Sequence, residues 1–262
     1  MPPLPVHTAL RYVQPLREGG SLPAVVETDG GLYVVKFRGA GQGPRALIAE
    51  LIVGLIATEL GLPVPDLALV DVVEPFGANE PDPEIRDILL KSRGLNVGLR
   101  YLDGAFNFEV GAAGDFISPT FAAEVVWLDA FLTNPDRTPK NPNLLVWDRR
   151  PWLIDHGAAL YVHHDWRRAD VERARAPFSL IAEHVLLRVS GDIEDADRRF
   201  AAALGPGVLE ATLAAVPGAL LMDPFARGDF RSAGDARERY FDYLAARLAA
   251  PRPFTDEAVR AR

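Results

Sequence analysis

Short runs in the first hundred residues alternate between hydrophobic and polar positions with a period of two, which is the pattern of β-strands. The segments AVVET and LYVVKF flank a DGG turn at residues 29–31, so we expect a β-hairpin there. A longer apolar segment, RALIAELIVGLIATEL, predicts a helix that ends at Gly61, with Pro63 beyond it. Further strands are expected over residues 66–73, 87–93 and 95–102.

Helical patterns dominate from about residue 103 onward. Ser118 and Pro119 are typical of the N-cap and the first position of a helix, and they precede an apolar segment that we expect to be helical, residues 120–133. Two further helices are expected over residues 179–189 and 238–250.

One short hairpin interrupts this helical part, because LLVW and PWLID flank the polar turn DRR. The pattern as a whole predicts an α+β protein of two lobes. The first, residues 1–102, is β-rich with one main helix, and the second, residues 103–262, is mainly helical and carries the small hairpin.

The composition is that of a globular protein with a sizeable core, since 48% of the 262 residues are hydrophobic and 24% are charged. A net charge of -8 without a Lys- or Arg-rich run argues against binding to nucleic acid or to an anionic membrane. The chain has no cysteine, which excludes disulfides, thiolate metal sites and a cysteine nucleophile.

No segment has the pattern of a targeting or membrane-spanning sequence. The start, MPPLPVHTAL, lacks the basic and apolar regions of a signal peptide, and the most apolar window is broken by Glu50 and Glu59. We therefore expect a cytoplasmic protein whose partners are small molecules or other proteins.

Lys36 and Glu50 are charged residues in apolar surroundings. Strand alternation places Lys36 on one face with Leu32 and Val34, and Glu50 shares a helix stripe with small residues. A lone carboxylate there would be expensive to desolvate, so one interpretation is an ion pair that holds the lysine amine for a phosphate group. The alternatives are an edge lysine whose amine reaches water and a solvated glutamate at the margin of the stripe.

Two glycine clusters flank the predicted hairpin. Gly19 and Gly20 precede its first strand, where backbone amides can approach phosphate oxygens. The second cluster, GAGQGP, lies between a strand and a helix, but Pro44 stands where a dinucleotide-binding fingerprint requires its third glycine. The P-loop pattern GxxxxGKS or GxxxxGKT is absent from the sequence.

The stretch NPDRTPKNPNLLVWDRRPWLIDHG, residues 134–157, has the most specific pattern. Asp136 and Asn141 lie in one loop, and the hairpin brings Asp155 back beside that loop. A phosphoryl-transfer site needs a carboxylate near the attacking hydroxyl and a few hard oxygen ligands for Mg²⁺, and this set supplies both. The alternative interpretation is that Asp136 and the asparagines are ordinary turn formers.

These segments resemble the HipA-like kinases, which are distant relatives of the phosphoinositide and protein kinases. The resemblance lies in NPDRTPKNPNLLVW with LIDHG, and it extends upstream through VVKF, AEL and LIATELGLPVP in the same order, over roughly residues 15–160. It implies a bilobal protein-kinase-like fold with ATP and Mg²⁺ in the cleft. The implied reaction transfers the γ-phosphoryl group to a hydroxyl acceptor, with Ser or Thr of a protein as the acceptor that fits the family.

The resemblance also implies roles for individual residues. Asp136 is similar to the catalytic base of the family, and Asn141 and Asp155 are similar to its Mg²⁺ ligands. Lys36 matches the lysine that contacts the nucleotide phosphates, and Glu50 matches the partner of that lysine.

Two further segments carry a nucleotide-binding role by the same resemblance. Gly19, Gly20 and Ser21 resemble the loop over the phosphates. Tyr101 and Leu102 correspond to the hinge beside the adenine.

At one position the sequence departs from the kinase pattern, and at another two asparagines compete for one role. His156 stands where many kinases have the phenylalanine of an Asp-Phe-Gly motif. Asn143 directly precedes a strand, as the metal-binding asparagine of protein kinases does, so it competes with Asn141 for that role; the five-residue spacing from Asp136 favours Asn141.

Three alternatives to a protein kinase remain at this level. A nucleotide-binding pseudokinase or interaction module would carry the same residues, and a small-molecule alcohol kinase would need the same chemistry. The segment YVHHDW, with His163, His164 and Asp165, suggests a metal-dependent phosphohydrolase, although no second cluster at ligand spacing accompanies it.

Overall fold

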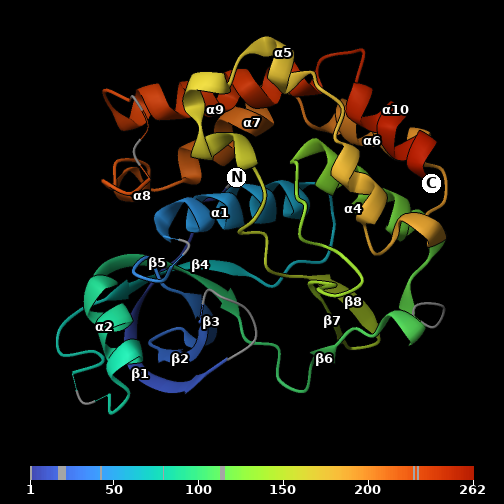
Figure 1. Cartoon of the computed structure of the whole chain (residues 1–262). Coiled ribbons are helices and arrows are strands. Elements are labelled where there is room, and N and C mark those ends of the chain that lie inside the picture. The colour runs from blue at the N-terminus through green and yellow to red at the C-terminus, as the bar shows by residue number, and fades with distance from the viewer. Residues whose placement is uncertain are drawn as a thin grey trace.

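The computed structural model describes residues 2–16, 22–41, 43–78, 80–112, 116–226, 228 and 230–262. It shows a β-barrel on one side and a layer of helices on the other, with helix α1 (Gly43–Glu59) between them (Figure 1). The predicted α+β organisation is confirmed, with a β-rich N-terminal part, a helical C-terminal part and a small hairpin.

Five strands close the barrel in the order β1-β2-β3-β5-β4. β1 and β4 pair in parallel, and the other neighbours are antiparallel. The expected hairpin is β2–β3, in which Thr28 pairs with Gly31, whose φ of 109° suits a glycine. The strands are β1 (Val6–Pro15), β2 (Ala24–Thr28), β3 (Gly31–Lys36), β4 (Leu67–Val72) and β5 (Gly94–Arg100).

Helix α1 is buried around its whole circumference from Ala46 to Ala57. One side packs on β4 and β5, and the opposite side packs on α7 (Pro206–Ala215) and α8 (Gly218–Leu221). It ends as predicted, since Gly61 adopts a φ of 76° and the Leu62 amide donates to the carbonyl of Ala57 at 2.9 Å. The hydrophobic core therefore continues from the barrel side through α1 into the helical half.

The helical half begins at α4 (Pro119–Phe131), whose N-cap is Ser118 as expected; the Ser118 hydroxyl accepts from the Phe121 amide at 3.1 Å. The hairpin is also confirmed, with Leu144 opposite Leu153. Its strands are β7 (Leu144–Trp147) and β8 (Arg150–Leu153), with β6 (Phe106–Asn107) at the edge. In the described part of this half, the further helices are α5 (Val171–Ala174), α6 (Ile193–Ala203), α9 (Ala233–Leu248) and α10 (Pro253–Ala261), with 3-10 helices η1 (Val110–Ala112), η2 (Tyr161–His164), η3 (Trp166–Arg168), η4 (Ser179–Glu183) and η5 (Leu187–Val189).

Two expected elements were wrong. The strand expected over residues 87–93 is helical as far as Lys91, as part of α2 (Pro83–Lys91), because the Asp82 carboxylate accepts from the Glu84 amide at 2.9 Å and caps the start of that helix. The helix expected over residues 179–189 is broken into η4 and η5, because His184 between them is extended and its side chain bonds to Asp129 on α4.

Within the described ranges, no helix is long and apolar enough to cross a membrane.

Candidate active site

Lys36 lies at the end of β3 with its amine inside the protein rather than in water. Its Nζ is 2.6 Å from Oε2 of Glu50 on α1 and 2.5 Å from Oδ1 of Asp155, which follows β8. The side chain of Lys36 is 7% exposed and that of Glu50 is fully buried. The interpretation of an edge lysine that reaches water is therefore wrong, as is that of a solvated glutamate.

The three ionisable groups shift one another's pKa values. Burial lowers the pKa of Lys36, but the charges of Glu50 and Asp155 outweigh burial and raise the pKa above its usual value. Burial raises the pKa of Asp155, but the charge and the hydrogen bond of Lys36, with smaller effects of nearby residues, together lower it further, so the net direction is down. For Glu50, burial raises the pKa more than Lys36 lowers it, and its Oε1 has no hydrogen-bond partner among the described residues.

Asp155 and His156 are fixed by the backbone as well as by side chains. Asp155 has a φ of 55°, a left-handed conformation that is uncommon outside glycine. The next amide, that of His156, donates to Oε2 of Glu50 at 2.8 Å. Glu50 thus positions both Lys36 and the start of the segment after β8.

Asp136 lies in the loop between α4 and β7, where both candidate asparagines reach it. Asn141 and Asn143 each donate from Nδ2 to Oδ2 of Asp136, at 2.9 Å and 3.2 Å. Asn141 is exposed, whereas Asn143 is 7% exposed. The backbone carbonyl of Asn143 accepts from the amide of Ile154 at 3.1 Å, which places the end of this loop beside Asp155.

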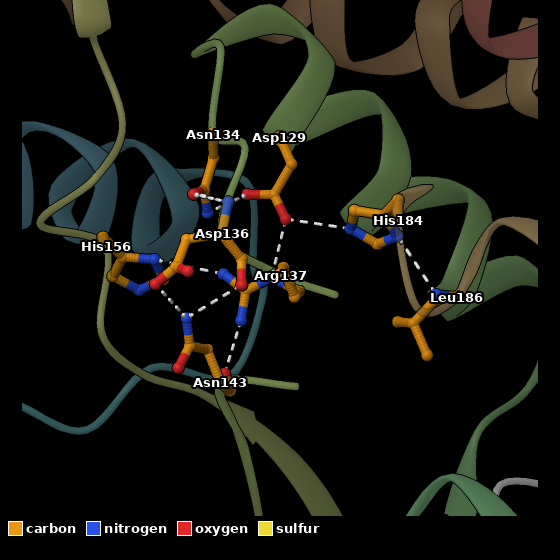
Figure 2. Close-up of polar contacts among 8 residues, drawn as sticks. All are labelled: Asp129, Asn134, Asp136, Arg137, Asn143, His156, His184 and Leu186. Atoms are coloured by element: carbon orange, nitrogen blue, oxygen red, sulfur yellow. Dashed lines mark hydrogen bonds and ion pairs between the residues drawn. The ribbon is translucent and has the colours of Figure 1, made fainter. Parts of the chain in front are cut away.

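Arg137 joins this loop to the segment after β8 (Figure 2). Its guanidinium contacts Oδ2 of Asp129 at 2.6 Å, the carbonyl of Asn143, and Nδ1 of His156 at 3.2 Å. Arginine only donates, so Nδ1 of His156 accepts and the ring proton lies on Nε2. Burial and the Arg137 charge lower the pKa of His156 to about 3, so the ring is neutral near pH 7.

Asp129 anchors the network from inside α4. Its carboxylate accepts from Asn134 at 3.0 Å, from Arg137 and from Nε2 of His184 at 2.9 Å. Although burial opposes ionisation, the Arg137 charge and the His184 hydrogen bond hold the pKa of Asp129 well below its usual range. The Leu186 amide donates to Nδ1 of His184 at 3.1 Å, so both ring nitrogens of that histidine are satisfied.

Sequence reasoning missed the residues of this network: Asp129, Asn134, Arg137 and His184. One signal was available, because Asp129 is a single carboxylate in the otherwise apolar segment VVWLDAFL, where an unpaired charge would be costly. No local pattern indicated that His184, more than forty residues along the chain, is its partner.

The predicted nucleotide-binding residues have mixed outcomes. Gly19, Gly20 and Ser21 lie outside the described residues. Tyr101 and Leu102 directly follow β5, and the Tyr101 amide donates to the carbonyl of Leu32 at 3.0 Å, so they continue the barrel edge toward the helical half.

The donor set fits magnesium better than a transition metal. Asp155 and Asn141 offer one carboxylate and one amide oxygen, and Mg²⁺ takes few protein ligands because it keeps waters and binds nucleotide phosphates. Among the described residues there is no group of three or more His, Cys, Asp or Glu side chains placed to hold a metal. His163 is fully buried and contacts the Tyr240 hydroxyl at 3.0 Å, which leaves the phosphohydrolase alternative without a ligand cluster in the described chain.

Residues 13–172, more than half of the chain, match the family described as HipA-like kinase. The chain belongs to the HipA-like kinase family. This family membership implies phosphotransferase activity and the use of ATP, and it confirms the resemblance drawn from the sequence.

The fold of this HipA-like kinase is similar to a crystal structure of the proinflammatory kinase CtkA of Helicobacter pylori, with a TM-score of 0.61. The alignment covers 99% of this chain and 98% of that chain at 15% sequence identity. At this sequence identity the similarity shows a kinase-like fold, and it does not indicate which activity this chain has. No curated protein matches the sequence.

Proposed function

We propose that this HipA-like kinase transfers the γ-phosphoryl group of ATP to a hydroxyl acceptor, Ser or Thr of a protein, and that Mg²⁺ is required. The observation that carries the proposal is the position of Lys36 Nζ between Glu50 and Asp155, at 2.6 Å and 2.5 Å. A fixed cation beside a carboxylate that is still partly exposed is what a magnesium-bound triphosphate requires.

Lys36 and Asp155 are the groups we assign to the nucleotide. Lys36 remains a cation because two carboxylates raise its pKa, so its amine can contact the phosphates. Asp155 and Asn141 would hold Mg²⁺, which when bound neutralises charge on the phosphate oxygens. Glu50 keeps Lys36 in place and does not meet the substrate.

Asp136 is the residue we assign to the acceptor. Both asparagines donate to its Oδ2, and within the described chain no hydrogen bond reaches its Oδ1. In the proposed step the acceptor hydroxyl oxygen forms a bond to the γ-phosphorus, and the bond from that phosphorus to the β–γ bridging oxygen breaks. The hydroxyl proton passes to Oδ1 of Asp136, and ADP leaves.

The test uses purified protein, γ-labelled ATP, Mg²⁺ and a mixed library of Ser- and Thr-containing peptides. We expect labelled peptide or labelled protein with the wild type, and a loss of about 10²-fold or more in Asp136→Ala, the range expected for a general base. Asp242→Ala is the matched control, because Asp242 is an exposed aspartate on α9. It should transfer phosphate as the wild type does.

A second measurement separates binding from transfer. We expect ATP with Mg²⁺ to raise the melting temperature of the wild type and of Asp136→Ala alike, because Asp136 is assigned to the acceptor. A raised melting temperature without transfer in the wild type would instead indicate a nucleotide-binding module. If neither effect occurs, the proposed function is wrong.

A further inference from the structure

A hollow of about 580 Å³ lies beside the loop that carries Asp136. One wall is the loop itself at Thr138, Pro139 and Lys140, and the other walls come from η1 and from residues 182–189, which include η5. Thr138 and Lys140 follow Asp136 by two and four positions, so, at no more than about 3.6 Å per residue, they lie within about 7 Å and 14 Å of it. An extended polypeptide with a hydroxyl at Asp136 would cover that distance in about two to four residues, so it can reach this hollow.

The far wall is fixed to the same network that positions Asp136. The Val185 amide donates to the carbonyl of Arg137 at 2.9 Å, and His184 bonds to Asp129. Figure 2 shows His184 and Leu186 on the side of the loop opposite His156. The far wall of the hollow is therefore fixed relative to the loop that carries Asp136.

The lining is mainly apolar, and part of it is open to solvent. Val110 and Val189 are 44% and 42% exposed, and Phe108 and Leu186, in the same lining, are 4% and 1% exposed. Exposed apolar side chains gathered over a hollow indicate a surface that another molecule covers. A small polar alcohol would need convergent polar groups for orientation, which this lining does not supply.

The charges at the rim are mostly positive, although the chain carries a net charge of -8. Lys140 and Arg188 are exposed, and among the described residues Lys140 has no ion pair, whereas Arg188 donates from one guanidinium nitrogen to the backbone oxygen of Arg262 at 3.3 Å. The one acid in the lining is Glu183. The rim is therefore complementary to an acidic residue next to an apolar one.

We propose that this hollow binds the acceptor polypeptide, taking an apolar side chain against Val110 and Val189 and an acidic residue beside Lys140 and Arg188. Both lie within roughly two to four residues of the Ser or Thr that receives the phosphoryl group. This inference rests on the proposed function and adds a sequence preference to it.

A positional-scanning library of peptides, each with one fixed Ser or Thr, tests the preference. We expect selection of Leu, Ile, Val, Met or Phe at one flanking position and of Asp or Glu at another. With the best peptide, Val189→Glu should raise KM about tenfold or more, the loss expected when one apolar contact is replaced by a desolvated charge, and should leave kcat within about twofold. Arg188→Glu should shift the acidic preference toward Lys and Arg.

Val171→Glu is the control, since Val171 on α5 is 63% exposed and outside the hollow, so the same substitution there should leave KM unchanged. ATP hydrolysis without peptide should be equal in all variants. Three results would overturn the inference and leave the proposed phosphotransfer intact. They are transfer to peptides without an apolar preference, equal KM values in Val189→Glu and Val171→Glu, and transfer only to small alcohols. No transfer to any acceptor would overturn both.

Discussion

Lys36 contacts two carboxylates from distant parts of the chain, and the sequence predicted only one of these two contacts. The pairing with Glu50 followed from two charges in apolar surroundings, on a strand and on the helix after it. The contact with Asp155 spans 119 positions and was not predicted; the resemblance to kinases implied only that both residues serve the nucleotide and its metal. Local pattern can indicate that a buried charge needs a partner, but the choice among distant partners depends on the fold.

The Mg²⁺ dependence of phosphoryl transfer in variants of Asn141 and Asn143 can show which of the two residues binds the ion. Ligands of Mg²⁺ remain accessible because the ion keeps several waters, and Asn141 is exposed whereas Asn143 is nearly buried. We expect Asn141→Ala to raise the Mg²⁺ concentration for half-maximal transfer about tenfold, the effect of losing about 1.4 kcal/mol. Asn143→Ala should lower kcat without that change, because it removes a hydrogen bond to Asp136.

Steady-state rates at a series of Mg²⁺ concentrations would check this. The reverse result, with the Mg²⁺ requirement raised only in Asn143→Ala, would place the ion at Asn143.

Because His163 is fully buried, we expect the protein to lose stability in mild acid. Burial, with smaller effects from His164 and Arg45, lowers the pKa of His163 well below 6.5 in the folded protein. Below about pH 6.5 the unfolded chain therefore takes up a proton that the folded protein does not, so the free energy of unfolding falls as the pH falls. One such group contributes up to about 1.4 kcal/mol per pH unit.

The variant His163→Gln stays neutral and should lose this contribution. Urea unfolding between pH 8 and pH 4.5 would measure it. We expect the stability difference between wild type and variant to be constant above pH 7 and to shift in favour of the variant below pH 6. Parallel curves throughout would show that His163 does not titrate differently on unfolding.

At the scale of elements, the end of α4 depends on a residue far along the chain. Arg247 on α9 donates to the carbonyls of Phe131 and Ala130 at 2.6 Å and 2.7 Å, and to those of Ala174 and Ala176 at 2.9 Å and 3.0 Å. The last carbonyls of a helix lack hydrogen-bond partners within the helix, and the buried guanidinium of Arg247 donates the missing hydrogen bonds. It also joins α4, α5 and α9.

Arg247→Met should therefore destabilise the protein strongly. The substitution keeps an apolar chain of similar length but leaves buried carbonyls unsatisfied, at about 1–3 kcal/mol for each such group. We expect the free energy of unfolding to fall by about 3 kcal/mol or more in urea titrations. Arg198→Met, at a side chain that is 64% exposed, should change it by less than about 0.5 kcal/mol; equal effects in the two variants would contradict this role.

The elements that the sequence predicted well are those with a local signal. The β2–β3 hairpin, the end of α1 at Gly61 and the start of α4 at Ser118 each rest on a turn or cap that lies within a few residues. The region of η4 and η5 could not be predicted in the same way, because the hydrogen bond of His184 to Asp129 interrupts a helical pattern from outside. The same contact is the part of the site that local reasoning missed.

At the scale of the whole molecule, one core crosses the boundary between the barrel and the helical half. The larger hydrophobic cluster contains α1, parts of β4 and β5, and residues from α4 through α10, while a smaller cluster fills the barrel interior. An ion pair between Arg38, just after β3, and Asp223, just after α8, adds a polar contact across the same boundary. The division at residue 102 stays a prediction.

This arrangement predicts one cooperative unfolding transition. All four tryptophans lie between residues 127 and 166, so their fluorescence reports on the helical half, whereas far-ultraviolet circular dichroism reports on the whole chain. We expect the two signals to give the same urea midpoint, because α1 cannot leave one half without exposing the core of the other. An earlier transition seen only by circular dichroism would show that the barrel unfolds separately.

The all-round burial of α1 also has a consequence for synthesis. During translation this helix and its barrel strands leave the ribosome long before α7 and α8 exist, so one apolar side of α1 has no intramolecular cover for most of that time. A fragment that ends at residue 102 would keep that side exposed permanently and should aggregate rather than fold as a soluble lobe. The nascent chain is thus a natural client for a chaperone until its last hundred residues have been made.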